Sequence, residues 1–422
     1  MRRTPQERRL RRALAALCVT QVVSWGVLYY AFPVMVVQVA ADTGWGTGPA
    51  MAAFSVGAVV NALAGVLVGP LLDRLGPRLV MSVGSVAGAL GVVAVASAPT
   101  LPWFFAAWVV VGLGQAGTLY PPAFVALTRW FEPPRRVRAL TVVTIAGGLA
   151  STVFAPTTAA LTERLGWRPA LLGLAAVALV VTLPLHAGLL TPPWRPGVDR
   201  ARGQVTAEER AHARAVVRSR PFLLLTAGLA LGTFGLYAAT VNLVPLLTGR
   251  GLSTQLAAWG LGLVGAGQLV GRLGYGVLSR HTSIRTRTAG LLAGGGAVVV
   301  VLGLVPGPAG LLLALAVLAG ALRGALTLVQ ATAVAERWGT TAFGRVNGLF
   351  GAPIMAVIAL APGAGALLAG ALGGFPTAAL VLGAGAVVAG VLVVLTGQDA
   401  RRPLVESGDL RDLSGKPVRD RH

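Results

Sequence analysis

Long apolar stretches alternate with short polar ones along almost the whole chain of 422 residues. Each apolar stretch is close to the roughly 20 residues that a helix needs to cross a bilayer. The first stretch is too long for a signal-peptide core and eleven more follow, so we expect it to be retained. The pattern predicts twelve membrane-spanning helices, at about 13–36, 49–72, 79–97, 101–127, 139–161, 168–190, 221–247, 254–278, 289–306, 309–335, 346–370 and 375–396.

The polar stretch at 191–220 is the longest before the C-terminal tail, and it divides the predicted spans six and six. Within it, Thr206 and Glu209 have the spacing of a capping box, which predicts a short helix over about 207–218. Its arginines are typical of a helix that lies against anionic lipid headgroups. The predicted organisation is a basic N-terminus (1–12), a first half (13–190), a central loop (191–220), a second half (221–396) and a polar tail (397–422).

The two halves also resemble each other in sequence. Gly69 matches Gly276 at an offset of 207 residues, and LTRWF at 127–131 falls on AERWG at 335–339 near an offset of 208. Matches at nearly one offset indicate duplicated six-helix halves. In such a layout the substrate site lies near the membrane midplane, between the repeats.

Composition places the chain among membrane proteins, because 55% of its residues are hydrophobic and only 12% are charged. The net charge of +21 is spread over the loops, which argues against a nucleic-acid partner. With a cytoplasmic N-terminus, the cytoplasmic segments hold 30 of the 35 Lys and Arg residues, the external loops three and the spans two. This asymmetry predicts that both termini are cytoplasmic. Because arginine-rich, lysine-poor composition is typical of G+C-rich bacteria, we expect an inner plasma membrane protein.

No pattern in the sequence indicates catalysis, a metal or a cofactor. The single cysteine, Cys18, excludes an intrachain disulfide and a multi-cysteine metal site. The four histidines are scattered without metal-ligand spacing, and there is no Walker loop for ATP. We therefore expect no enzyme activity and no cofactor, and transport energy should come from an ion or solute gradient.

Two arginines fall inside predicted spans, whereas all fourteen carboxylates lie at span ends, in loops or in tails. At 1.5 Å per residue, Arg323 is about 20 Å from the outer end of its span and Arg272 about 9 Å from the cytoplasmic end. Burying an arginine costs at least roughly 2.5 to 3.5 kcal/mol. A bound anion is a candidate partner, since a guanidinium grips a carboxylate through two hydrogen bonds. Alternatively, Arg323 bonds carbonyls at a helix kink and Arg272 extends to the cytoplasmic interface.

Polar and aromatic residues recur at helical spacing in four of the predicted spans. Such faces either line a cavity or hydrogen-bond neighbouring helices, and the sequence leaves both interpretations open. The residues are Arg323, Thr327 and Gln330 in the tenth span, Gln115 and Thr118 in the fourth, Thr233, Tyr237 and Thr240 in the seventh, and Gln21, Trp25 and Tyr29 in the first.

The segment GPLLDRLGPR at 69–78 resembles the G-x-x-x-D-R-x-G-x-R loop between the second and third helices of the major facilitator superfamily. The resemblance implies an all-α membrane fold of twelve helices in two pseudo-symmetric halves, with helices 1, 4, 7 and 10 around a central cavity. It also implies that this loop is a gate near the cytoplasm. The matching residues are Gly69, Asp73, Arg74, Gly76 and Arg78.

Three further segments, GWGTGPAMAAF, YPPAFVALTRWF and LGWRPALLGLA, resemble the monocarboxylate and oxalate:formate branch of that superfamily. The resemblance implies carboxylate recognition by an arginine of the eighth helix, and Arg272 within GQLVGRLGYG matches those surroundings. The oxalate:formate members are also associated with a lysine in the eleventh helix, which this sequence lacks. That departure argues against a dianion, although Arg323 is a candidate substitute for the charge.

We therefore expect a carrier of a small organic anion, a monocarboxylate, that works by alternating access as a monomer in the lipid bilayer. Arg323 and Arg272 are the predicted anion contacts. A co-transported proton is a hypothesis, and without a buried carboxylate it would travel on the substrate, Glu336 or His186. The alternatives are an efflux carrier for hydrophobic compounds and a non-transporting sensor on the same fold.

Overall fold

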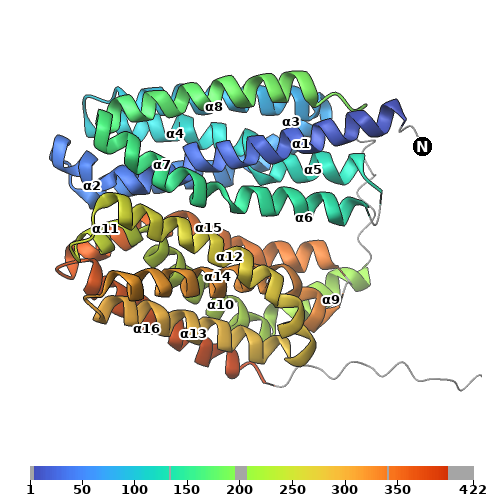
Figure 1. The fold of residues 1–422 in the computed structure, drawn as a ribbon. Coiled ribbons are helices and arrows are strands. Elements are labelled where there is room, and N and C mark those ends of the chain that lie inside the picture. The colour runs from blue at the N-terminus through green and yellow to red at the C-terminus, as the bar shows by residue number, and fades with distance from the viewer. Residues whose placement is uncertain (1–3, 133–134, 195–206, 340–341, 398–422) are drawn as a thin grey trace, which may run out of the picture.

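The fold is a bundle of helices that run side by side along one axis (Figure 1). The computed structural model describes residues 4–132, 135–194, 207–339 and 342–397, and the regular secondary structure in these ranges is helical. The expectation of an all-α membrane fold is confirmed.

The first half begins with one continuous membrane segment from Pro5 to Thr43. Its helix starts at Pro5 rather than near 13, because Thr4 and Glu7 form a capping box that satisfies the first free backbone amides. The elements are α1 (Pro5–Trp25), the π-helix η1 (Gly26–Tyr30), α2 (Ala31–Thr43), α3 (Thr47–Ala96), α4 (Leu101–Thr118), α5 (Tyr120–Trp130), α6 (Arg135–Gly148), α7 (Ala150–Leu165) and α8 (Trp167–Leu189).

The second half follows a short helix of the central loop, α9 (Ala207–Arg218), which confirms the helix expected over about 207–218. Thr206, the expected cap of that helix, lies outside the described residues. The remaining elements are α10 (Arg220–Val241), α11 (Leu243–Thr248), α12 (Thr254–His281), α13 (Ile284–Leu304), α14 (Ala309–Trp338), α15 (Phe343–Ala371) and α16 (Phe375–Val394).

Eleven helical segments among the described residues are long and apolar enough to cross a membrane. One of them, α3, has 50 residues and so a length of about 75 Å, more than twice the roughly 30 Å of a bilayer core. Gly76 interrupts its helical geometry with φ 79° and ψ 165°. Divided at Gly76, α3 supplies the second and third expected spans, and the segments then number twelve.

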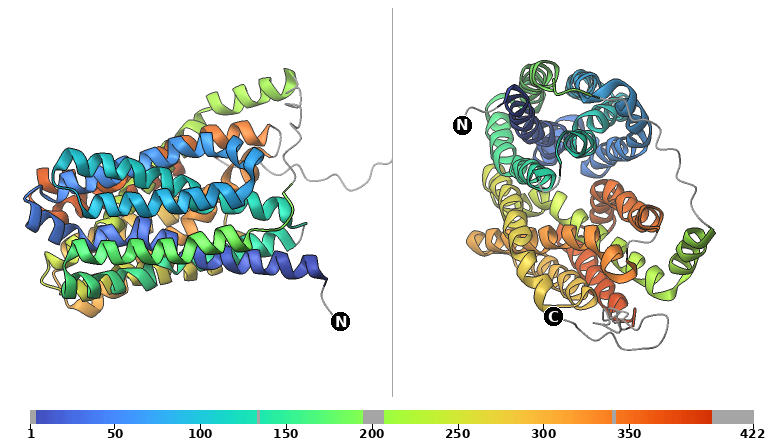
Figure 2. Two further views of the ribbon diagram at one scale, coloured as in Figure 1. Left: turned by 90° about the horizontal axis from the view of Figure 1, so that it is seen from above. Right: turned by 90° about the vertical axis from the view of Figure 1, so that its right-hand side faces the viewer.

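Each half packs around a buried core of its own, and the two halves form separate groups when viewed along the helices (Figure 2, right). The core of the first half is rich in aromatic rings: Phe32 contacts Phe54, Phe104 and Trp108 at centroid distances of 4.9 to 5.7 Å. The core of the second half consists mainly of Leu, Val and Ala. This separation is the arrangement expected of two halves that move against each other.

Most of the contacts between the halves are made by two helix pairs, α3 with α15 and α7 with α12. The Gly363 amide donates to Ser55 Oγ at 2.8 Å, and Thr152 Oγ1 donates to the Gly262 carbonyl at 3.0 Å. These contacts lie toward the end of the bundle opposite the N-terminus. We call that end the far end, and the end that carries Pro5 and α9 the terminal end (Figure 1).

Candidate functional site

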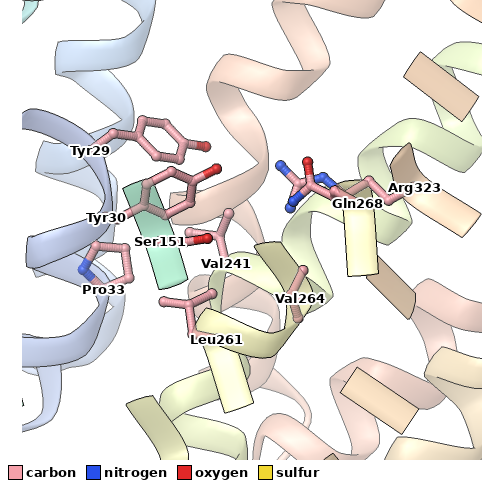
Figure 3. Close-up of a pocket in the computed structure, with 9 residues that line it drawn as sticks. All are labelled: Tyr29, Tyr30, Pro33, Ser151, Val241, Leu261, Val264, Gln268 and Arg323. Atoms are coloured by element: carbon pink, nitrogen blue, oxygen red, sulfur yellow. The ribbon is translucent and has the colours of Figure 1, made fainter. Parts of the chain in front are cut away.

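A narrow pocket lies between the two halves near the middle of the bundle (Figure 3). Its lining side chains lie so close together that the space between them is too small to hold a water molecule. Residues of both halves line it, so any ligand inside contacts both halves at once. The first half contributes Tyr29, Tyr30, Pro33 and Ser151, and the second half contributes Val241, Leu261, Val264, Gln268 and Arg323.

Among the described residues that line this pocket Arg323 is the one that is charged, and only 4% of its surface is exposed. Its Nη1 donates to Thr240 Oγ1 at 2.8 Å, and its guanidinium lies 3.6 Å from the centroid of the Tyr237 ring. Its Nε has no hydrogen-bond partner among the described residues. The alternative in which Arg323 bonds carbonyls at a kink is wrong, because α14 runs unbroken from Ala309 to Trp338.

Four glycines set the position of Arg323 by bringing α12 and α14 into backbone contact. Gly267 and Gly271 lie one turn apart on α12, and Gly320 and Gly324 lie one turn apart on α14. A Cβ on any of them would fall 1.8 to 2.2 Å from a backbone oxygen of the opposite helix. Such small-residue faces allow membrane helices to pack closely. The contact holds Arg323 in the same rigid unit as the pocket residue Gln268.

The two pocket tyrosines come from the π-helix η1, whose wider turn brings the adjacent residues Tyr29 and Tyr30 to one side. Gln115 fixes this turn from α4, since its Nε2 donates to the Leu28 carbonyl at 2.7 Å. Gln115 is one of the residues for which the sequence leaves open a place in the cavity or a contact with a neighbouring helix. The structure places it, 1% exposed, in a helix–helix hydrogen bond that shapes the pocket wall.

Arg272 lies one helical turn beyond Gln268 toward the terminal end, outside the residues that line the pocket. It is half-buried and faces the first half. Its Nη1 and the Tyr120 hydroxyl both donate to the Thr144 carbonyl, at 3.5 and 3.2 Å. Arg272 therefore lies between the two halves on the terminal-end side of the pocket.

Several other predicted contacts face neighbouring helices rather than the pocket. Gln330 Nε2 donates to Thr233 Oγ1 at 2.8 Å, and Gln21 Nε2 donates to the Thr118 carbonyl at 2.7 Å. A role in substrate binding stays a prediction for these residues, but the side-chain amide nitrogens of both already donate inside one half. The same holds for Thr118 Oγ1, bonded to the Gly114 carbonyl, and Thr327 Oγ1, bonded to the Arg323 carbonyl.

Sequence reasoning missed three polar residues that line the pocket: Tyr30, Ser151 and Gln268. Ser151 is 1% exposed and its hydroxyl has no partner among the described residues. Gln268 lies in the segment GQLVGR, directly beside the glycine pair of α12, where a polar residue between two membrane glycines was the available signal.

The predicted gate is a compact cluster at the terminal end. Asp73 forms an ion pair with Arg129, whose guanidinium lies 4.6 Å from the centroid of the Trp194 ring. Trp194 Nε1 donates to the Asp73 carbonyl at 3.2 Å. Trp194 lies near the start of the central loop. Its contacts therefore hold the beginning of this loop against the Asp73–Arg129 ion pair. Of the other motif residues, Arg74 and Arg78 are exposed, Gly69 is half-buried and Gly76 is buried beneath Trp194.

The second half holds a similar ion pair with the charges reversed. Arg287, at the start of α13, pairs with Glu336, near the end of α14. Arg280 stands where the repeat places the counterpart of Asp73, so this ion pair of the second half uses other positions than the pair of the first half. Glu336 and His186, which hydrogen-bonds Ser85 Oγ at 2.8 Å, both lie outside the residues that line the pocket.

Gly76→Ala should destabilise the gate. Gly76 has φ 79° and ψ 165°, a conformation open almost only to glycine, and an added Cβ would lie 3.1 Å from the Trp194 ring. We expect a loss of about 1 to 3 kcal/mol of stability, seen as a lower melting temperature of the purified protein. Gly65→Ala is the matched control, since a Cβ there meets nothing within 4 Å and should leave the melting temperature unchanged.

Two helical halves with a pocket between them, and a polar motif at the join of the second and third spans, are the architecture of a multi-pass membrane transporter. The chain belongs to the Major Facilitator Superfamily, whose family model matches residues 17–311.

Curated relatives and solved structures agree with this assignment. The chain is 29% identical over 256 residues to monocarboxylate transporter 13 of Bos taurus, a match that covers 60% of this chain and 56% of the relative. It is 32% identical over 241 residues to monocarboxylate transporter 11 of Homo sapiens, covering 57% and 48%. The matches thus span about half the length of these relatives. A bacterial homologue of the human lysosomal transporter Spinster, solved in an inward-facing and occupied conformation, shares the fold with a TM-score of 0.72, 16% identity and coverage of 94% and 97%.

Proposed function

We propose that this protein is a secondary active transporter that moves a small organic anion, a monocarboxylate, across the plasma membrane by alternating access. The observation that carries the proposal is Arg323, a buried guanidinium at the central pocket whose Nε lacks a partner. Thr240 and the Tyr237 ring stabilise this cation without neutralising its charge.

A carboxylate ligand would supply the missing charge. Intramembrane arginines usually find an anionic partner or line a wet cavity. A guanidinium binds a carboxylate through two parallel, charge-assisted hydrogen bonds, which are about twice as strong as neutral ones. The similarity to proteins named monocarboxylate transporters supports the same ligand class.

The proposed cycle uses the two halves and the gate. The ligand binds at Arg323 between the halves, and rocking of one half against the other opens the pocket first to one end and then to the other. We place the terminal end in the cytoplasm, because most of the arginines lie in its loops and tails whereas Arg164, Arg168 and Arg250 lie at the far end. Arg272 would then guide the anion between pocket and cytoplasm.

Counterflow into liposomes tests this function. Purified full-length protein is reconstituted with an unlabelled carboxylate inside, and uptake of the labelled carboxylate is followed for acetate, lactate, benzoate and oxalate. We expect exchange of monocarboxylates and none of their uncharged amides. Absence of exchange with every carboxylate would overturn the proposal, and transport of neutral or cationic hydrophobic compounds alone would establish an efflux carrier in its place.

A further inference from the structure

The first half presents a continuous row of aromatic rings that leads from the pocket toward the terminal end. Trp25 lies 6.4 Å from Tyr30 and 5.0 Å from Tyr120, and Tyr120 lies 5.1 Å from Phe124, measured between ring centroids. We call these four residues the ring row. All four are only half-buried, so each packs on its neighbours while part of its surface stays free.

The opposite side of the pocket is polar at two adjacent residues, one of them a cation, and apolar elsewhere. Arg323 and Gln268 provide the polar groups of the second half, and the remaining lining there is aliphatic, from Val241, Leu261 and Val264. Figure 3 shows the hydroxyl ends of the Tyr29 and Tyr30 rings pointing toward the Arg323 and Gln268 side chains across the pocket. A ligand that satisfies both sides has one anionic group and an apolar body.

The site offers little to a second negative charge. Arg272 does not line the pocket, and its Nη1 is directed to the Thr144 carbonyl beside the Tyr120 hydroxyl. A dianion would therefore place one charge against aliphatic side chains or ring faces, at a high desolvation cost. The ring faces carry negative partial charge, which disfavours an anion there but suits the positive edge of another ring.

We propose that the substrate class is an aromatic monocarboxylate, with the carboxylate on Arg323 and the ring packed against the ring row. This inference rests on the proposed transport of a monocarboxylate and narrows it. Flat rings fit the free edges and faces of Trp25, Tyr30 and Tyr120 in offset or edge-to-face contacts, which add to the gain from burying apolar surface. Small carboxylates would bind Arg323 but would make no contact with the ring row.

Calorimetric titration of the purified full-length protein with four ligands tests the inference. Comparison of benzoate with cyclohexanecarboxylate measures the contribution of the aromatic ring, and comparison with acetate measures that of apolar bulk. Comparison with benzamide measures the contribution of the negative charge. We expect benzoate to bind at least about 10-fold more tightly than acetate, and about 2- to 12-fold more tightly than cyclohexanecarboxylate, from one ring contact. Benzamide should not bind.

Variants of the ring row provide the second arm. Trp25→Leu should weaken benzoate by about 2- to 12-fold and leave acetate unchanged, while Trp25→Phe should retain most of the benzoate affinity. Trp103→Leu is the matched control, because Trp103 is 52% exposed at the far end and outside the pocket. Equal affinities of the three carboxylates in the parent protein would overturn the inference even if a variant fails to fold. That result would leave the proposed function intact, whereas no binding of any carboxylate would overturn both.

Discussion

Arg323→Gln should strongly weaken the thermal stabilisation that carboxylates give the purified protein. The variant removes the one charged group of the pocket and keeps a side chain that can still bond Thr240. Hydrogen bonds to a charged group contribute about 1.5 to 3 kcal/mol, so carboxylate affinity should fall by about 10- to 150-fold. The measurement is the melting temperature with and without a monocarboxylate, over a range of concentrations.

The ligand-free melting temperature separates a binding role from a structural one. Because Arg323 is buried and its Nε is unpaired, its neutral replacement should leave the unliganded protein at least as stable as the parent. Arg168→Gln is the control: Arg168 donates to the carbonyls of Ala96 and Ala98, so its loss should lower stability and preserve the carboxylate response. A variant at Arg323 that melts early and still responds to carboxylates would make this arginine structural.

Gly271→Ala should have the largest effect on folding of any single methyl addition in the second half. The new Cβ would lie 1.8 Å from the Ala321 carbonyl oxygen, and backbone on both sides prevents a local adjustment. Overpacking of a tight contact costs about 1 to 3 kcal/mol and occasionally more, and the upper end applies here because α12 and α14 must separate. We expect a strong loss of monodisperse protein on size-exclusion chromatography.

Gly274→Ala provides a control on the same helix, less than one turn further along. A Cβ at Gly274 meets nothing within 4 Å, so this variant should elute and melt like the parent. Comparable behaviour of the two variants would contradict the proposal that the glycine contact positions Arg323. If Gly271→Ala folds, it should also show a weaker carboxylate response, since Arg323 moves with the helix contact.

The fold could be predicted from hydropathy because a bilayer requires each span to be long, apolar and helical. The boundaries were less certain: α1 begins at Pro5, where a capping box rather than hydropathy decides, and the second and third spans are joined through Gly76. Only dihedral angles reveal such a join, since the sequence around Gly76 reads as an ordinary polar loop.

The sequence could identify the pocket residue that carries a charge. It could not identify the residues whose place in the pocket depends on the local geometry of a helix. Arg323 stood out because a charge in an apolar span is costly. A period of 3.6 residues grouped Gln21, Trp25 and Tyr29 on one face, but η1 changes the helical register and brings Tyr30 into the pocket as well. Periodicity also cannot distinguish a residue that lines a cavity from one that contacts a neighbouring helix. Gln330 shares the helical face of Arg323 in the sequence, and in the structure it bonds Thr233.

The division of the pocket between the two halves has a thermodynamic consequence. The cation belongs to the rigid α12–α14 unit of the second half, and the tyrosines belong to η1 of the first. A ligand long enough to touch both sides binds best when the halves are together, so its binding energy favours the closed arrangement of that pocket. An anion such as formate, which contacts only the guanidinium, has little differential affinity for open and closed states. Ligand length, and not charge alone, would then determine which anions shift the conformational equilibrium and which merely occupy the site.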